Sequence, residues 1–128
     1  MRRLIFLALC SWLALPVVTF ATDAAGGHAC ENATSTAAMR ECENVRLKQA
    51  DDGMNVAYRA LSARLDQRGQ EKLHAAQEAW LKFRAAEANY QADSVRDGTL
   101  APLIAASVAA DMTELRRIEL EKAAREIK

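Results

Sequence analysis

Apolar residues recur at spacings of three and four over three long stretches of this 128-residue chain. That spacing places them on one face of an α-helix. No stretch alternates Val, Ile or Thr with polar residues, as half-buried strands do. Ala, Leu, Glu, Arg, Lys and Gln are abundant, and all of them favour helices. The sequence therefore predicts an all-α fold, a small helical bundle of about three main helices.

The first predicted helix spans about residues 36–65. Thr34 or Ser35 precedes it, and a side-chain oxygen there caps a helix by accepting a free backbone N–H. Gly53 lies within a polar part of this helix and costs about 1 kcal/mol relative to alanine, so we expect a bend there. The apolar positions of this helix recur at spacings of three and four: Met39, Cys42, Val45, Met54, Ala57, Tyr58, Leu61 and Leu65.

The second predicted helix spans about residues 70–95, and the third runs from about Pro102 to Ile127. Gly98 lies between them and suits the left-handed position that ends many helices, while Pro102 fits a first helical turn. Large aromatic side chains dominate the packing of small cores. The residues that we expect in the core are Tyr58, Leu61, Trp80, Phe83, Tyr90, Val108 and Met112.

One acidic residue interrupts the apolar pattern of the second helix. Glu87 falls on the same seam as Phe83 and Tyr90, and a buried carboxylate needs a partner. The candidate partners are Arg84, Arg116 and Arg117. Alternatively, Glu87 lies at the helix margin and reaches water.

The N-terminus has the pattern of a secretory signal peptide. Two arginines precede a nearly continuous apolar run from Leu4 to Phe20, and small residues follow. We expect cleavage after Ala21, with Ala24 as the alternative. Residues 1–21 are then the signal peptide and residues 22–128 a single helical domain, periplasmic or secreted in a bacterium.

Two membrane-attached alternatives fit this N-terminus less well. A membrane-spanning helix needs about 20 apolar residues, and this run is shorter and contains Pro16. A lipid anchor at Cys10 is disfavoured because the apolar run continues well past it. We therefore expect no stable membrane anchor after cleavage.

The charge of the exported chain argues against nucleic-acid binding. Loss of residues 1–21 removes two arginines and no acidic residue, so 17 basic and 17 acidic residues become 15 and 17. An electrostatic nucleic-acid binder needs a basic face. The slight acidity is compatible with a cationic protein partner.

Cys30 and Cys42 remain after cleavage, and we expect them to form a disulfide near the N-terminus. Export brings them to an oxidising compartment, where an even number of cysteines favours pairing. A metal site with His28 is the alternative, but these three residues lack the paired spacing of a zinc module.

No catalytic motif emerges, so we expect a binding protein rather than an enzyme, without metal or cofactor. His74 and Glu78 share a helical face, but a zincin needs a second histidine and a third ligand. Asp51 and Asp52 resemble paired catalytic carboxylates, yet no second motif supports glycosidase chemistry. A solvated bend explains them better.

The chain resembles the LprI-type lysozyme inhibitor family over about residues 30–122. The most specific piece is Ala75-Ala76-Gln77-x-Ala79-Trp80-x₂-Phe83-Arg84. The other pieces that carry the resemblance are Cys30-x₃-Thr34, Met39-x₂-Cys42, Ala50-Asp51, Asn55-x₂-Tyr58-x₂-Leu61, Gly98-x-Leu100-Ala101-Pro102 and Thr113-x₂-Arg116.

The resemblance implies a small helical domain, secreted or lipid-anchored, that in some members inhibits lysozyme. Members usually carry a second cysteine pair, whose places hold Ala88 and Val108 here. The resemblance therefore implies a bundle with one disulfide fewer than is usual in the family, and a less rigid contact between the second and third helices.

Two functions follow as hypotheses. In the first, the protein occludes the cleft of a lysozyme, with partner contacts at the Cys30–Cys42 loop, at Asp51 and Asp52, and at Asp97 in the turn before the third helix. In the second, it is a periplasmic structural or assembly factor that binds another envelope protein through a helical face.

Overall fold

Three long α-helices form the part of the chain that the computed structural model describes, Cys30 and residues 32–127. α2 spans Thr36–Ser62, α3 Gln67–Ala92 and α4 Ala101–Glu126, and the short 3₁₀ helix η1, Asp93–Val95, follows α3. No strand occurs within these residues, so the all-α prediction is confirmed. The expected signal peptide, residues 1–21, lies outside the described residues.

Capping side chains set where two of the helices begin. The Ser35 hydroxyl accepts a hydrogen bond from the amide of Ala38 at 3.2 Å. The Asp66 carboxylate accepts one from the amide of Gly69 at 2.8 Å, so α3 begins three residues earlier than the apolar pattern predicted. The left-handed cap expected at Gly98 is wrong, because no glycine of the described part has a positive φ. The end of α3 tightens into η1 instead.

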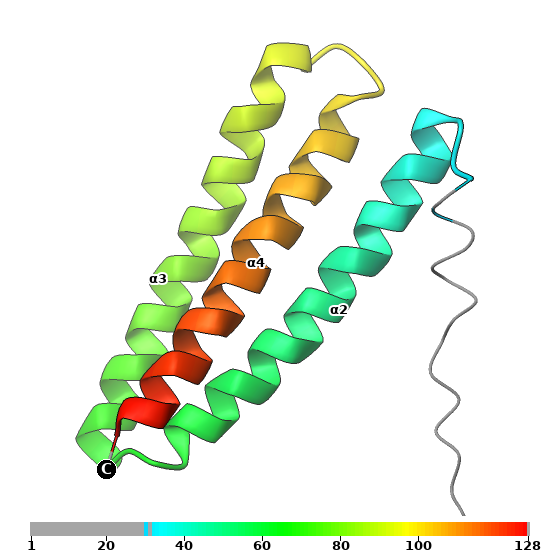
Figure 1. Cartoon of the computed structure of the whole chain (residues 1–128). Helices are drawn as coiled ribbons and strands as arrows, with labels where there is room; N and C mark the ends of the chain where they lie inside the picture. Colours follow the sequence, from blue (N-terminus) through cyan, green and yellow to red (C-terminus); the bar gives the residue numbers. More distant parts are fainter. Residues whose placement is uncertain (1–29, 31, 128) are drawn as a thin grey trace, which may run out of the picture.

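The three helices form a V, in which α2 and α3 are the arms and α4 lies between them (Figure 1). α2 and α3 meet at a short connection beside the C-terminus, which we call the closed end, and separate toward the other end. α4 packs along most of α2 and less extensively on α3, whereas α2 and α3 touch little. At the open end, the start of α2 lies near the connection between α3 and α4.

The hydrophobic core lies toward the closed end. Its buried centre is Met54, Ala57, Leu61 and Leu120, and the partly buried residues packed around it are Tyr58, Leu65, Leu73, Trp80, Ala123, Ala124 and Ile127. Toward the open end the buried apolar residues are all alanines: Ala50, Ala88, Ala92, Ala106 and Ala110. Val108 and Met112, also expected in the core, are half-buried on α4.

Two of the expected core residues are on the surface. Phe83 is 55% exposed and Tyr90 is 76% exposed, so the prediction that they belong to the core is wrong. The inner face of α3 instead carries Trp80 with Gln77, Arg84 and Ala88. α3 therefore packs a partly polar face against the bundle and leaves the aromatic side chains of Phe83 and Tyr90 exposed.

Gly53 lies inside an uninterrupted α2, so the predicted bend is absent. Its role is to let a side chain of α4 approach the backbone of α2 closely. A Cβ atom at this position would lie 2.9 Å from Cδ of Arg117 on α4. The missing side chain lets the Arg117 stem cross α2 directly over the backbone.

Candidate binding surface

A polar network inside the bundle joins all three helices. Arg84 on α3 donates hydrogen bonds through Nη1 to Asp51 Oδ1 on α2, at 2.5 Å, and to Thr113 Oγ1 on α4, at 2.6 Å. The Thr113 hydroxyl is fully buried and donates to the carbonyl of Ala109 at 2.6 Å. Buried polar groups are tolerated when they are paired, and here the pairing fixes the positions of the helices.

Trp80 sits between two arginines at the centre of this network. The guanidinium carbons of Arg84 and Arg116 lie 5.4 and 5.8 Å from its ring centroid, within cation–π range. Arg116 also donates to Oε1 of the buried Gln77 at 3.1 Å, and the Gln77 amide donates to Met54 Sδ at 3.2 Å. The inner face of α3 therefore carries a polar network that is satisfied throughout.

The pairing of these arginines corrects two expectations. Glu87 pairs with none of Arg84, Arg116 and Arg117 in the described part of the chain. It accepts a hydrogen bond from Gln91 at the surface, at 2.8 Å, which fits the alternative position at the helix margin. Arg116 pairs with Glu119 instead, at 3.0 Å. Asp51, expected at a partner contact, is engaged by Arg84 within the bundle. The signal for the Arg84–Asp51 pair was present in the sequence, since both residues belong to the motifs that carry the family resemblance.

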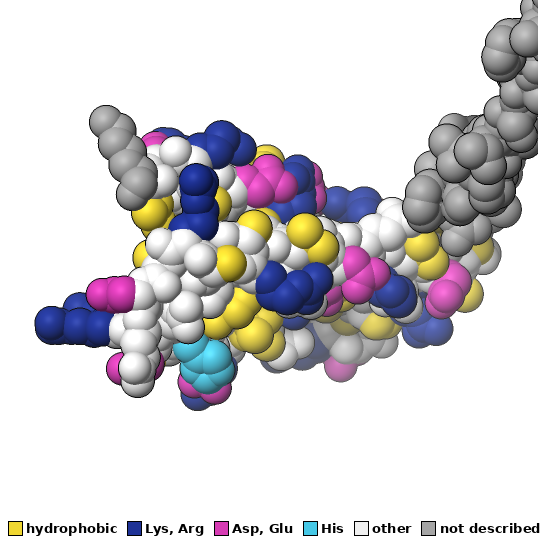
Figure 2. Space-filling view, turned by 90° about the horizontal axis from the view of Figure 1, so that it is seen from below, with side chains coloured by type: hydrophobic (Ala, Val, Ile, Leu, Met, Phe, Trp, Pro, Cys, Tyr) yellow, Lys and Arg dark blue, Asp and Glu magenta, His cyan; other side chains and the backbone are white. Residues whose placement is uncertain are grey.

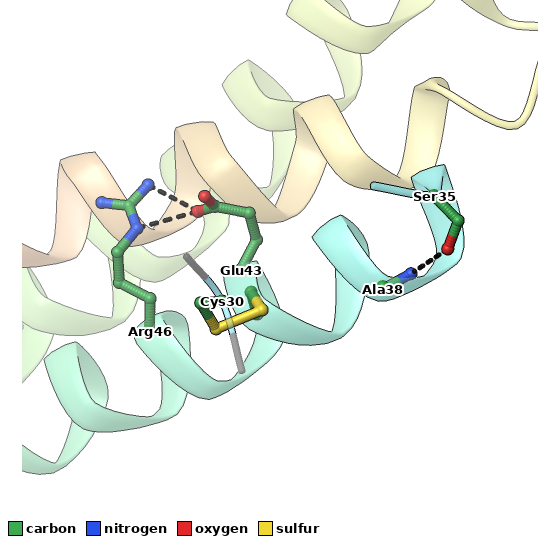
Figure 3. Close-up of a disulfide and its surroundings, with 6 residues drawn as sticks. Cys30, Ser35, Ala38, Glu43 and Arg46 are labelled. Atoms are coloured by element: carbon green, nitrogen blue, oxygen red, sulfur yellow. Dashed lines mark hydrogen bonds and ion pairs between the residues drawn. A yellow bond between two sulfur atoms is a disulfide. The ribbon is translucent and has the colours of Figure 1, made fainter. Parts of the chain in front are cut away.

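Nearer the surface, Arg46 of α2 forms one ion pair with α4 and one within its own helix. Arg46 contacts Asp111 and Glu43, each at 2.6 Å, and also the carbonyl of Ser107 at 3.2 Å. The pair between Arg46 and Glu43 is drawn in Figure 3. The hydrogen bond to Asp111 is the largest of the causes that raise the pKa of the Arg46 guanidinium.

On α4, Arg117 pairs with Glu114 and Glu121. The hydrogen bond from Arg117 lowers the pKa of the Glu114 carboxyl. These contacts hold the Arg117 side chain along α4 where it crosses Gly53, and they leave its charge neutralised rather than available to a ligand.

The described residues contain no group of three or more His, Cys, Asp or Glu side chains that could hold a metal ion. His74 Nδ1 and Glu78 Oε2 are 3.9 Å apart on the exposed side of α3. Asp51 and Asp52 do not act together, because Asp52 pairs with Lys48 at 2.7 Å while Asp51 pairs with Arg84.

None of the helices within the described residues is both long and apolar enough to cross a membrane.

The open end brings together two of the segments expected to contact a partner. The predicted Cys30–Cys42 disulfide is formed, with a Cα–Cα distance of 5.5 Å, and it ties the chain before α2 to its second turn (Figure 3). The start of α2 and the connection after α3 line one depression of about 300 Å³. Its lining residues are Thr36, Ala37, Arg40, Thr99 and Pro102.

Asp97 is exposed at this end and has no ion-pair partner among the described residues. Asp52 is exposed as well but lies in the middle of α2, away from the open end. The surface at the opposite end is mixed in charge, with Lys and Arg side chains interspersed among Asp and Glu (Figure 2). The open end, defined by the disulfide loop, the depression and Asp97, is therefore the candidate binding surface.

A family model described as "Lysozyme inhibitor LprI" matches residues 29–120, which cover most of the chain. The chain belongs to the LprI lysozyme inhibitor family. This is a family of inhibitors and not of enzymes. No curated protein and no solved structure matches the chain.

The residues of the internal network overlap with the motif that carries the resemblance to the LprI family. The most specific motif of the resemblance holds Gln77, Trp80, Phe83 and Arg84. Three of these residues build the interhelical network, and Phe83 alone is on the surface. This part of the motif therefore reflects how the helices of this chain pack, while Phe83 has no such role.

Proposed function

We propose that this protein is exported, is cleaved near Ala21, and inhibits a lysozyme in the periplasm or outside the cell by blocking the substrate cleft. The match to the LprI family over residues 29–120 carries the proposal. The formed Cys30–Cys42 disulfide supports the location, because such bonds persist in oxidising compartments.

The open end is the contact that we propose. A cleft is blocked most simply by a protruding segment, and the connection between α3 and α4 protrudes at the end of the bundle (Figure 1). Asp97 there has no intramolecular ion pair within the described chain. It can therefore pair with a cationic side chain at the rim of a cleft without first breaking an internal bond.

A lysozyme titration tests the proposal. Protein recovered from the periplasm after expression with its own leader should slow the digestion of cell walls at a stoichiometric ratio to lysozyme. Asp97→Arg should weaken inhibition at least about tenfold, as expected when a charge pair at an interface is reversed. Asp52→Arg is the matched control, because Asp52 is an exposed aspartate away from the open end. Failure of the unmodified protein to inhibit lysozymes of several types would contradict the proposal.

A second candidate is a periplasmic assembly factor that binds another envelope protein through α4. It is favoured by two large apolar side chains on the outer face of that helix, Leu115 at 63% and Ile118 at 46% exposure. Capture of an envelope protein that is lost in Leu115→Glu, while lysozyme is not inhibited, would favour this function over the first.

A further inference from the structure

The outer face of α3 carries an apolar stripe that the bundle does not use. Its members are spaced alternately by three and four residues, and all are exposed: Ala76, Ala79, Phe83, Ala86 and Tyr90. At a rise of 1.5 Å per residue, the stripe is about 21 Å long. α3 packs on the other helices through a different face, which carries Gln77, Trp80 and Arg84, so nothing in the described chain covers the stripe.

The spacing of this stripe specifies the kind of surface that fits it. Apolar residues at alternating intervals of three and four form the seam of a two-helix coiled coil. The partner is therefore a helix with a similar seam. α3 itself has the required pattern, which makes a second copy of this chain a candidate.

The sizes of the side chains favour self-association in the antiparallel direction. Aromatic residues occupy two positions of the stripe, and alanines lie between them. An antiparallel pair places Phe83 of one copy against Ala86 of the second, and Tyr90 against Ala79, so that each aromatic side chain faces an alanine. A parallel pair would stack the two Phe83 rings and leave gaps at the alanines.

The charges at the two ends of the stripe are complementary to each other. Arg68 and Lys72 continue the face beyond Ala76 and have no ion-pair partner within the described chain. Asp93 continues it beyond Tyr90, and its only described ion pair is an exposed one with Arg96, at 3.2 Å. In the same register Asp93 of one copy lies opposite Ala76 of the second, one helical turn from Lys72. The antiparallel pair therefore brings these opposite charges within a turn of each other twice, whereas parallel copies bring like charges together.

We infer that two copies of this protein associate through the α3 stripe in antiparallel orientation. The pair places the two open ends far apart, at opposite ends of the assembly. Each copy keeps its proposed lysozyme surface free, so this inference does not rest on the proposed function. An interface built on one short stripe lies at the weak end of specific protein contacts.

Sedimentation equilibrium of the periplasmic protein, up to about 1 mM because the interface is small, tests association. We expect a monomer–dimer equilibrium. Phe83→Glu should weaken it at least about tenfold, because an aromatic anchor is replaced by a charge. Val56→Glu should leave it unchanged, since Val56 is equally exposed, at 59%, but lies on α2. A monomer at all concentrations, or equal effects of both variants, would overturn the inference.

A charge exchange tests the orientation. Lys72→Glu and Asp93→Lys should each weaken the dimer, and the double variant should restore it, since the swapped charges are again opposite in sign and one helical turn apart. No restoration would overturn the antiparallel arrangement. Lysozyme inhibition separates the two proposals, because Phe83→Glu should retain it and Asp97→Arg should not affect the dimer. Loss of inhibition in a monomeric Phe83→Glu protein would assign the stripe to the lysozyme contact instead.

Discussion

The Arg84 guanidinium on α3 and the Asp51 carboxylate on α2 meet at 2.5 Å, with only 18% of the arginine side chain and 34% of the aspartate side chain exposed. They belong to the two helices that otherwise touch little. This ion pair, extended by Thr113 on α4, is therefore a principal link between the arms of the V.

Removal of Asp51 should destabilise the bundle. Asp51→Ala leaves Arg84 largely buried without its counter-ion. Losing one partner of a fully buried pair costs about 3–5 kcal/mol, so a partly exposed pair should cost roughly 2 kcal/mol. Denaturant unfolding followed by circular dichroism measures the loss. Asp52→Ala is the control and should change the free energy of unfolding by less than about 0.5 kcal/mol. Equal effects of the two variants would show that the Arg84 contact contributes nothing.

Loss of the disulfide should loosen the start of α2. The bond joins cysteines separated by 12 residues, and the chain-entropy model gives up to about 3 kcal/mol for a loop of this size. Cys30→Ser with Cys42→Ser should lower the melting temperature and speed amide exchange in the first two turns of α2. If exchange increased evenly along all three helices, the bond would be stabilising the whole bundle rather than this segment.

Gly53 should respond differently to substitution when Arg117 is absent. Alanine is about 1 kcal/mol better than glycine inside a helix, but its Cβ would lie 2.9 Å from Cδ of Arg117. Gly53→Ala should therefore be close to neutral alone and stabilising by about 1 kcal/mol in an Arg117→Ala background. Identical effects in both backgrounds would contradict the close approach.

The ion pair of Glu114 should contribute stability that depends on pH. The hydrogen bond from Arg117 lowers the pKa of Glu114 in the folded state. A lowered pKa stabilises the folded protein above the unfolded-state value of about 4.3 and ceases to do so as pH falls through the folded value. The difference in melting temperature between the unmodified protein and Glu114→Gln should be present at pH 7 and should vanish in acid. A difference that persisted at pH 2 would have another cause.

The number of helices and the disulfide could be predicted from the sequence, since helical spacing and cysteine pairing are local signals. Which residues form the inner face of α3 could not be predicted from the sequence. Periodicity identifies which face of a helix is apolar, and on α3 the apolar stripe with Phe83 and Tyr90 faces outward. The inner face carries Gln77 and Arg84. These polar side chains can be buried only because Asp51, Thr113 and Arg116 form hydrogen bonds with them, and those partners come from distant parts of the chain.

The candidate site was predictable only in part for a similar reason. The Cys30–Cys42 loop and Asp97 are far apart in sequence, and only the V-shaped arrangement brings their segments to one end. By sequence alone, Asp51 is as suitable as Asp97 for a surface role, because both are acidic residues in polar segments. What separates them is the partner that each one meets, which sequence spacing does not reveal.

The confinement of the buried large apolar side chains to the closed end divides the bundle energetically. Alanines bury little area compared with Met54, Leu61 and Leu120, and apolar burial contributes roughly in proportion to area. Brief local openings should therefore begin where alanines line the helices, with the slowest-exchanging amides near Leu61 and Leu120. Spontaneous fluctuations would then concentrate at the very end that is proposed to meet a lysozyme, allowing its shape to adjust while the opposite end keeps the protein folded.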